Sequence, residues 1–456
     1  MTPEQPAQAP PQSPPTLPPA PRAEVQWEVG GKSIHPVLDF DLERRLAFVC
    51  VPLPLREGEG NGKTRQSKPY LVVTGPGFKN LVPLELANIP LDAEPVFIEP
   101  TSRWPQSHLR SFLDGTAPAA TGAEVFSALV DVIGRYVDTA DPVHNKLLGL
   151  FVMMSYIFPA FPTVCYLKLS GPRASGKTRL ASILSMVCHN ALHTSSLTPA
   201  SIFRVTQGTR CTLIADEMEG LGTNSQLSTL LNGGYKRGAM VVRAGTKGKL
   251  DLFQSYGPKV IASIEPLNDV LASRTLLVSL TPTKDAAKAR LAVTEASEDW
   301  GRLRSQLYSW AMTHWHDAAT VVLPESAGIS NRLAELWAPL LSIAATLEPQ
   351  KQGLVAELVG YAARSMAPTV PRHSFTEAEQ AVLGALARLA GQGRPAELTP
   401  AAILAAAAGI PGAAGLTTNG LGTILRRWEL FRSRRHASDG QRYGIDWGRV
   451  VELGGA

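Results

Sequence analysis

The spacing of apolar residues predicts a strand-rich beginning to this chain, followed by helices. Short β-branched or aromatic runs at Val37–Phe40, Leu46–Pro52 and Tyr70–Thr74 predict strands. From about residue 104 to 158 apolar residues recur at steps of three and four, which is the period of a helix. The residues with this spacing include Val125, Phe126, Leu129, Val130, Ile133 and Val137. A small, mostly β domain is therefore expected before a helical module.

The middle of the chain alternates apolar strands with helices. Cys165–Leu169 predicts a strand, a glycine-containing loop follows it, and Arg179–Val187 predicts a helix. Further apolar strands are expected at Thr212–Ala215, Val260–Ile264 and Leu276–Leu280. Strands that are separated in this way predict an α/β fold with a parallel sheet.

The most apolar run, Leu147–Val164, could be mistaken for a membrane segment. Pro159 and Pro162 interrupt it, however, and Lys146 borders it. We therefore expect a buried helix followed by a buried strand, and no membrane partner.

The last part of the chain predicts two helical regions and a hairpin. Ala286–Met366 is rich in alanine and leucine and predicts helices, and Pro368–Pro371 predicts a linker. The three helices and the hairpin expected after the linker span Thr376–Leu389, Pro400–Ala408, Thr417–Trp428 and Phe431–Ile445. Three helices and a hairpin predict a winged helix.

The composition limits the classes of protein to which this chain can belong, but it does not identify one class. The chain has 456 residues, 44% of them hydrophobic, enough for about three domains with buried cores. A net charge of +5 permits a polyanionic partner without requiring one. The four cysteines form no CxxC pair, so neither a zinc knuckle nor a disulfide framework is expected. A proline and glutamine tract stands in place of a signal peptide, and we expect a cytoplasmic protein.

The loop after the strand Cys165–Leu169 has the pattern GxxxxGKT. Its residues are Gly171, Pro172, Arg173, Ala174, Ser175, Gly176, Lys177 and Thr178. In such a P-loop the backbone amides surround the β-phosphate, the lysine reaches the β- and γ-phosphates, and the threonine hydroxyl ligates magnesium. The pattern therefore predicts ATP and Mg²⁺ as cofactors.

Two acids, Asp216 and Glu217, follow the strand Thr212–Ala215, where the carboxyl edge of a parallel sheet faces the loop. We expect Asp216 to hold the magnesium through water and Glu217 to orient and deprotonate the attacking water. Water as the acceptor argues against a small-molecule kinase, and the intact loop argues against a DNA-binding scaffold without enzymatic activity.

Three other polar residues are candidates for the nucleotide site. Arg274 stands just before the strand Leu276–Leu280, where an oligomeric ATPase can present a cation to its neighbour's γ-phosphate. Arg332 could contact phosphate as the helical region closes, and Ser263 could sense the γ-phosphate. A surface arginine, a solvated helix arginine and a core-edge serine are the structural alternatives.

Two basic regions predict contacts with DNA. Arg243, Lys247 and Lys249 belong to a predicted hairpin, Met240–Phe253, and could grip a phosphate backbone inside a ring, although a solvated hairpin also carries lysines. The second region surrounds the last helix and hairpin and includes aromatic residues. Its arginines are Arg426, Arg427, Arg432, Arg434, Arg435 and Arg442.

The order of these elements resembles the AAA+ ATPase domains of mobile-element and phage replication proteins, in the neighbourhood of superfamily-3 and minichromosome-maintenance helicases. The resemblance covers about residues 141–345, and Leu231–Gly238, Tyr256–Lys259 and Trp337–Leu341 are especially similar. It implies that Arg274 is an arginine finger acting on a neighbouring subunit and Arg332 a second sensor. Such helicases often have asparagine where this chain has Ser263. No primase motif is evident in the β-rich region.

These patterns divide the chain into six segments. They are a disordered proline-rich tail (1–22), a β-rich domain (23–103), a helical module (104–160), an AAA+ P-loop core (161–285), a helical lid region (286–366) and a winged-helix DNA-binding domain (372–456).

The resulting hypothesis is a ring-forming, hexameric ATPase that acts as a DNA helicase or translocase in the replication of a mobile genetic element. Its partners would be single-stranded or double-stranded DNA and further copies of itself. The alternative is an AAA+ initiator or remodelling switch that binds DNA without processive unwinding. The two hypotheses differ in whether single-stranded DNA stimulates hydrolysis and whether forked duplex is unwound.

Overall fold

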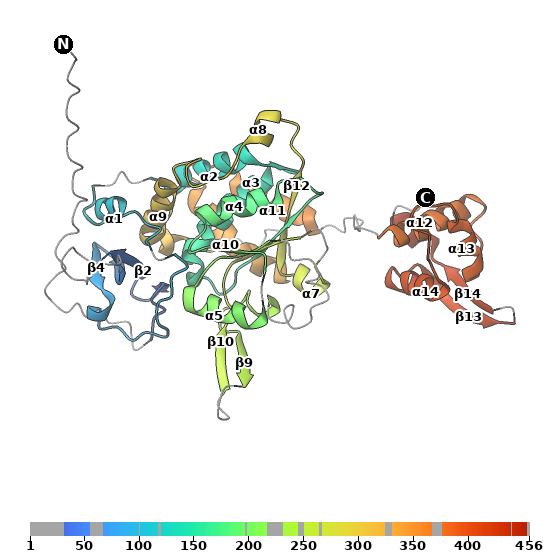
Figure 1. Cartoon of the computed structure of the whole chain (residues 1–456), viewed down its shortest axis with the longest axis horizontal. Coiled ribbons are helices and arrows are strands. Elements are labelled where there is room, and N and C mark those ends of the chain that lie inside the picture. The colour runs from blue at the N-terminus through green and yellow to red at the C-terminus, as the bar shows by residue number, and fades with distance from the viewer. Residues whose placement is uncertain are drawn as a thin grey trace, which may run out of the picture. The chain divides into compact units, whose positions relative to one another are not determined.

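The computed structural model forms two compact units, Met1–Ala362 and Ala363–Ala456, which are described separately (Figure 1). The structure describes residues 32–54, 67–99, 101–116, 120–196, 198–216, 231–244, 250–263, 267–323, 331–366, 376–438 and 440–453.

The first unit begins with an antiparallel sheet in the order β1-β2-β3-β4. Its strands are β1 (Leu38–Asp41), β2 (Leu46–Pro54), β3 (Ser67–Gly75) and β4 (Phe78–Pro83). Both faces of β2 are buried, because Phe48 and Cys50 belong to a small core of the sheet whereas Val49 and Val51 belong to the main core. The predicted N-terminal β domain is confirmed, and it packs against the rest of the unit.

Three helices follow this sheet. They are α1 (Gln106–Leu113), α2 (Gly122–Tyr136) and α3 (Val143–Ile157). A capping box between Thr121 and Glu124 begins α2. The strand expected at the end of the apolar run is wrong, because the chain makes a 3₁₀ turn, η2 (Phe158–Ala160), where Pro159 has no N–H to donate to a sheet. Among the described residues, no helix is long and apolar enough to cross a membrane.

A sheet of six strands forms the centre of the unit, in the order β5-β12-β6-β11-β8-β7. The strands are β5 (Asp138–Thr139), β6 (Tyr166–Ser170), β7 (Leu192–Thr194), β8 (Leu213–Ala215), β11 (Lys259–Ala262) and β12 (Thr275–Thr281). All neighbouring pairs are parallel except β5 with β12. The predicted parallel α/β sheet is confirmed. Because β11 lies between β6 and β8, the segments that follow these three strands meet at one edge.

Helices and a hairpin surround this sheet. α4 (Lys177–Val187) follows the P-loop, α5 (Pro199–Thr209) lies between β7 and β8 in the chain, and α7 (Asp269–Ala272) precedes β12. The predicted hairpin is confirmed as β9 (Met240–Ala244) and β10 (Leu250–Gln254), and Figure 1 shows it projecting from the unit beside α5.

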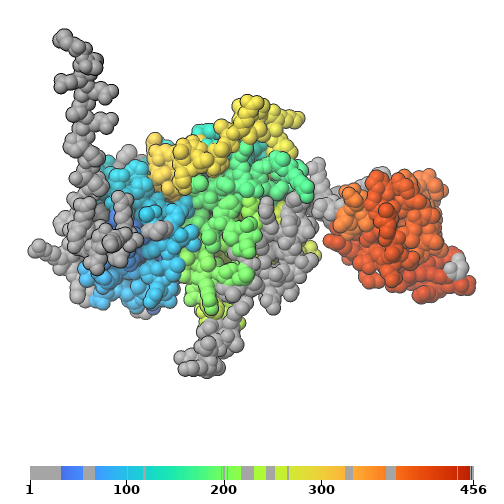
Figure 2. Space-filling view, viewed as in Figure 1, coloured from blue at the N-terminus to red at the C-terminus, as the bar shows by residue number. Residues whose placement is uncertain are grey.

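The helical region predicted after the sheet is also confirmed. Its helices are α8 (Ala286–Arg290), α9 (Trp300–Thr320), α10 (Asn331–Leu347) and α11 (Leu354–Met366). Trp315 of α9 packs on Phe40 of β1 with ring centroids 4.8 Å apart, so that α9 joins the β-rich domain to the main core. Figure 2 shows α8 (yellow) on the surface of the unit and the N-terminal sheet (blue) at one end of it.

The second unit contains the predicted three helices and hairpin, followed by a short helix that was not expected. These elements are α12 (Glu377–Gly391), α13 (Pro400–Ala407), α14 (Thr418–Arg427), β13 (Phe431–Ala437), β14 (Gly440–Ile445) and α15 (Trp447–Glu452). The unit has its own core, in which Leu386, Leu421 and Tyr443 are buried.

Candidate nucleotide site

The P-loop turns from β6 into α4 through two positions that favour glycine. Gly176 has φ 92° and forms the N-cap of α4. Gly171 has φ 152°, and a Cβ there would lie 2.6 Å from the carbonyl oxygen of Leu280. A side chain at either position would strain the backbone. The sequence pattern therefore corresponds to a formed loop at the amino end of a helix.

Polar groups within the loop fit a phosphate. The Lys177 Nζ donates hydrogen bonds to the carbonyl oxygens of Gly171 (2.8 Å) and Pro172 (3.0 Å), which places the ammonium over the loop. Ser175 is 4% exposed, and its Oγ has no hydrogen-bond partner among the described residues. A buried hydroxyl is costly unless it is paired. Together with the amino end of α4, these groups suit an anion such as a nucleotide β-phosphate.

Two arginines that the sequence analysis did not select hold the other end of α4. Arg103 donates to the carbonyl oxygens of Ser185 (2.6 Å), Met186 (3.0 Å) and Cys188 (3.2 Å). Arg304 also donates to Met186 (3.0 Å). Cations at the carboxyl end of a helix stabilise its unpaired carbonyls. These hydrogen bonds hold the carboxyl end of α4, the helix that follows the P-loop.

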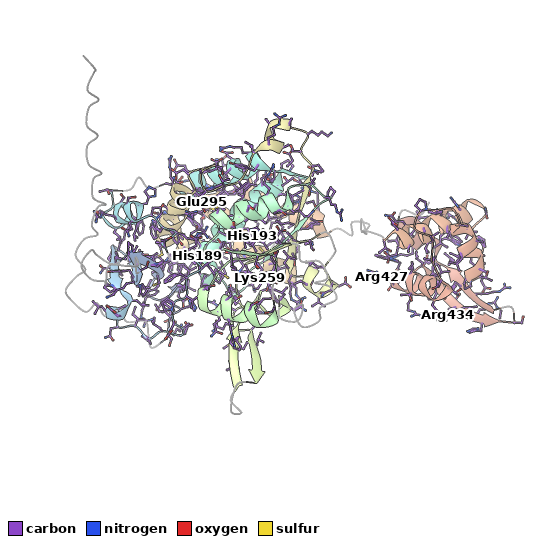
Figure 3. The ribbon with its side chains drawn as sticks, viewed as in Figure 1. His189, His193, Lys259, Glu295, Arg427 and Arg434 are labelled. Atoms are coloured by element: carbon purple, nitrogen blue, oxygen red, sulfur yellow. The ribbon has the colours of Figure 1, made fainter. Side chains whose placement is uncertain are left out.

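Asp216 lies directly after β8, at the same edge as the loop. It is 6% exposed, and its backbone N–H donates to Thr194 O at 2.9 Å. His193 of β7 places its Nε2 3.6 Å from Asp216 Oδ2. His193 is labelled in Figure 3 and was missed by the sequence analysis, because the strand that carries it was not expected.

The residues at this edge suit a magnesium ion that is held partly by the nucleotide. Thr178 at the start of α4 supplies a hydroxyl, and Asp216 supplies a carboxylate. Within the described ranges no group of three or more His, Cys, Asp or Glu side chains gathers as a metal site. Mg²⁺ commonly uses one or two protein carboxylates together with phosphate and water, so this sparse set is sufficient.

Several predicted residues fall outside what the structure describes. Glu217, Lys247 and Lys249 are not among the described residues, and the side chain of Arg243 is not described either. Their assignments stay predictions.

Ser263 follows β11 and lies between the loop strand and the acid strand. It is 3% exposed. Ala262, the residue before it, is paired with Leu169 of β6, and Ile261 is paired with Ala215 of β8. Lys168 of β6 donates from Nζ to the Ser263 carbonyl oxygen (2.9 Å) and also to Ser263 Oγ. The sequence analysis missed Lys168, because it interrupts a strand that was read as apolar.

Arg274 lies at the opposite end of the sheet from the P-loop. Its carbonyl oxygen accepts a hydrogen bond from the N–H of Tyr166, the first residue of β6, at 3.2 Å. The loop follows Ser170, the last residue of that strand. Since β6 is 5 residues long, the two ends are roughly 13 Å apart at the usual rise per residue. Arg274 is therefore far from the loop of its own chain.

Arg274 is held against an aromatic ring at this amino edge. Its Cζ lies 5.2 Å from the centre of the Tyr235 ring, and its Nη1 donates to Val270 O. Arg332 donates from Nη1 to Ser273 Oγ at 3.0 Å. The structure thus brings Arg332 to the residue beside Arg274, and not to Lys177. A cavity of about 790 Å³ opens here and is lined by Tyr235, Lys236, Ser273, Arg332, Leu333 and Glu335.

A buried lysine, Lys259, supports the amino edge from the interior of the unit (Figure 3). Its Nζ donates to Ser255 O (2.7 Å) and Gly257 O (3.0 Å) and lies 4.8 Å from the centre of the Tyr166 ring. Burial lowers the pKa of Lys259 to about 7. A Cβ on Gly234 would lie 2.8 Å from this Nζ, so only glycine allows the segment that carries Tyr235 to pass.

The hairpin formed by β9 and β10 exposes an apolar face. Met240 and Val242 of β9 and Leu252 of β10 are 49%, 57% and 53% exposed, and Val242 is paired with Leu252. The backbone N–H of Gln254 donates a hydrogen bond to the side-chain oxygen of Gln207 in α5 (3.2 Å). α5 therefore anchors the base of the hairpin.

The arginines predicted to contact DNA in the second unit differ in whether a described carboxylate pairs with them. Arg432 is bound to Asp446 through two hydrogen bonds (2.7 and 2.9 Å), Arg435 to Glu397 (2.6 Å) and Arg427 to Glu379 (3.1 Å). Among the described residues, Arg426 and Arg434 have no carboxylate partner within ion-pair distance, and both are exposed. Figure 3 labels Arg427 and Arg434 in this unit.

Comparisons with known proteins find distant structural neighbours. No family model matches the chain, and no curated protein matches it. The solved structures that match include the JCV helicase with a bound acetamide compound (17% identity, 56% of this chain and 72% of that chain, TM-score 0.27) and the NrS-1 C-terminal region (10%, 78% and 77%, 0.35). A full-length MCM homolog from Methanopyrus kandleri also matches (13%, 70% and 78%, 0.34). Because these TM-scores are below 0.5, the fold and the site rest on the residues of this chain.

Proposed function

We propose that this chain is an ATP-driven DNA helicase or translocase with an AAA+ core. The observation that carries the proposal is the joint placement of the P-loop, Asp216 and Ser263 at one edge of the parallel sheet, with Arg274 at the other. The first three supply a phosphate cradle, a magnesium ligand and a γ-phosphate contact. The fourth supplies a cation that only another copy of the chain can use.

In the proposed reaction, water attacks the γ-phosphorus of ATP and the bond to the β,γ-bridging oxygen breaks, giving ADP and phosphate. Glu217 accepts the proton of the attacking water. Lys177 neutralises charge on the β- and γ-phosphates, and Thr178 and Asp216 hold the magnesium that supplies further positive charge. ATP and Mg²⁺ are therefore the proposed cofactors.

The proposed site is completed by a second copy of the chain. Arg274 is roughly 13 Å along β6 from its own loop at the usual strand rise, so it would act on the γ-phosphate of a neighbour. Arg332, beside Ser273, would contribute a second cation from the same surface. An interface between unlike surfaces generates a ring when the rotation closes, and a hexamer is the ring that we propose.

The proposed DNA contacts lie on the β9–β10 hairpin and on the second unit. The lysines predicted at the hairpin tip would contact the DNA backbone in the channel of the ring. The second unit, in which three helices, a hairpin and a short last helix carry exposed arginines, would be a winged-helix domain that binds DNA. Replication of a mobile genetic element is the process in which we propose that these activities are used.

The experiment that tests this function measures ATP hydrolysis of the wild type and of Lys177→Ala with and without single-stranded DNA, together with the mass of the nucleotide-bound species. We expect DNA to stimulate hydrolysis by the wild type, Lys177→Ala to be inactive, and the nucleotide-bound protein to be oligomeric. A monomer whose hydrolysis ignores DNA would contradict the proposal.

The second candidate is an AAA+ initiator or remodelling switch. The observation that favours it is that the second unit folds around a core of its own. A forked duplex decides between the two candidates. Unwinding supports the helicase, whereas tight duplex binding without unwinding supports the switch.

A matched pair of variants tests the DNA surface of the second unit. Arg434 has no carboxylate partner among the described residues, whereas Arg435 is bound to Glu397. Arg434→Ala should weaken duplex binding and lower the slope of log K against log salt by about one. Arg435→Ala should have the smaller effect, because the Arg435 guanidinium is already bound to Glu397, which also lies 4.0 Å from Arg442. Equal effects would contradict this assignment.

A further inference from the structure

Two lysines are buried in the central strands, and they face opposite edges of the sheet. Lys168 of β6 is 6% exposed and Lys259 of β11 is 1% exposed. An ammonium group in the interior is costly unless hydrogen bonds compensate it. Lys259 meets backbone carbonyls and a ring at the amino edge, which is a structural role. Lys168 instead reaches the carboxyl edge, where the nucleotide site is proposed.

The positive charge of Lys168 sets the direction of its hydrogen bond to Ser263. An ammonium group has three donors and no acceptor, so in its bond to Ser263 Oγ the serine oxygen must be the acceptor. The hydroxyl proton of Ser263 therefore points away from Lys168. A second bond from the same Nζ, to the Ser263 carbonyl oxygen at 2.9 Å, also fixes the backbone of that residue.

The position of Ser263 puts this oriented hydroxyl in the nucleotide site. β11 separates β6 from β8, so Ser263 lies between the P-loop and Asp216. A hydroxyl whose oxygen accepts a bond from a cation is polarised, and its own O–H becomes a better donor. The acceptor that we infer for it when ATP is bound is an oxygen of the γ-phosphate.

We propose that Lys168 is a positioning residue for hydrolysis: it orients and polarises Ser263, which donates its hydroxyl proton to the γ-phosphate. The lysine and the serine together provide the donor that a single asparagine amide would carry by itself. This inference rests on the proposed function, because it requires ATP in the P-loop. Lys168 acts through Ser263 and does not contact the phosphate.

Four variants and one control test the pair. Lys168→Met keeps the length of the side chain and removes the charge, Ser263→Ala removes the hydroxyl, and Ser263→Asn replaces it with an amide. The double variant combines Lys168→Met with Ser263→Asn. Lys259→Met is the matched control, because it removes the other buried lysine of the same sheet. The measurements are kcat and KM for ATP, with thermal unfolding of each variant.

We expect Lys168→Met and Ser263→Ala to lower kcat by about 10²- to 10³-fold, the scale of losing one oriented donor, and to change KM little. The double variant should recover most of the lost kcat, because asparagine carries its own N–H donors. A merely structural Lys168 would not be rescued in this way. Any loss of kcat in Lys259→Met should not be recovered by adding Ser263→Asn, because the hydrogen bonds of Lys259 are to Ser255 and Gly257.

The results that would overturn the inference are distinct from failure of the proposed function. An active wild type whose kcat is unchanged in Lys168→Met, or a double variant no better than Lys168→Met, contradicts the role of Lys168. If Lys168→Met does not fold, the comparison of Ser263→Ala with Ser263→Asn tests the inference. An equal kcat in these two variants would contradict the role of Ser263 as a hydrogen-bond donor. A wild type that binds but does not hydrolyse ATP would overturn the proposed function and this inference with it.

Discussion

The two ends of strand β6 carry different kinds of chemistry. At its carboxyl end the loop from Gly171 to Thr178 uses backbone groups and a helix end, and buried side chains from neighbouring strands complete the edge. At its amino end the chemistry is cationic and lies by an open cavity, where Arg274 stacks on Tyr235 and Arg332 contacts Ser273. The carboxyl end of β6 therefore has groups that suit a phosphate, and the amino end has arginine side chains beside an open cavity.

Under the proposed function, this difference means that one copy of the chain holds two halves of the nucleotide site that cannot meet within it. A sheet is rigid, and roughly 13 Å of strand separates the halves at the usual rise per residue. Side-chain motion of an arginine does not span that distance. The comparison therefore predicts that substitutions at the carboxyl end impair hydrolysis in the site of the same subunit. Substitutions at the amino end should instead impair hydrolysis in the site of the neighbouring subunit.

The largest effect is expected at the amino end. Arg274→Ala should lower kcat by about 10³-fold or more, the scale of losing an arginine that stabilises the transition state of phosphoryl transfer. Binding of ATP should be retained, because the P-loop of the same chain is intact. Arg302→Ala, in an exposed arginine of α9, is the control and should keep its activity. A kcat close to that of the wild type would contradict the role of Arg274.

A loss of kcat is also expected at the carboxyl end, but with a different effect on ATP binding. Lys177→Ala should lower kcat by roughly 10²- to 10³-fold, as for loss of one preorganised charged group. It should also weaken ATP binding, which Arg274→Ala does not. Calorimetric titration with a non-hydrolysable ATP analogue measures this difference. Equal affinity in both variants would remove the distinction between the two ends.

The sequence predicted the carboxyl end more fully than the amino end, because a P-loop is a local signal. Its residues are consecutive, whereas Lys168 and Ser263 are 95 positions apart and meet only through the strand order. Arg332 was expected near phosphate as the helical region closes, but its neighbour Ser273 is separated from it by 59 positions. Contacts of this kind depend on tertiary packing, which periodicity does not report.

β7 and α5 are among the elements that the sequence analysis missed. β7 has only 3 residues, which is too short for alternation to be recognised. α5, by contrast, begins with a recognisable signal, since Thr198 and Ser201 form a capping box and Pro199 occupies the first turn. The sequence analysis therefore also missed His193 of β7 and Gln207 of α5.

A smaller effect is expected from the ring beneath Arg274. Tyr235→Leu should lower kcat by about 3- to 10-fold, the scale of one cation–π contact, because Arg274 loses the surface that orients it. Tyr235→Phe keeps the ring and should keep most of the activity. Steady-state hydrolysis at saturating ATP compares the two variants. Similar losses in both would show that the hydroxyl matters and the ring does not.

The smallest effect concerns stability and not turnover. Lys259 has a pKa lowered to about 7 by burial. The unfolded chain binds more protons there than the folded chain between about pH 7 and pH 10, so this lysine makes the free energy of unfolding rise with pH, by roughly 1 kcal/mol per pH unit. Lys259→Met should lack this rise. Chemical unfolding of both proteins at several pH values in this window checks it, and parallel curves would contradict the shifted pKa.

The most direct test of the shared site mixes two inactive proteins. Lys177→Ala keeps Arg274, and Arg274→Ala keeps the P-loop, so each lacks the half that the other has. If the site forms between copies, random mixing gives about one quarter of the interfaces an intact loop and an intact arginine. Hydrolysis should then reappear in the mixture although neither protein has it alone. A mixture that assembles together and stays inactive would contradict the account.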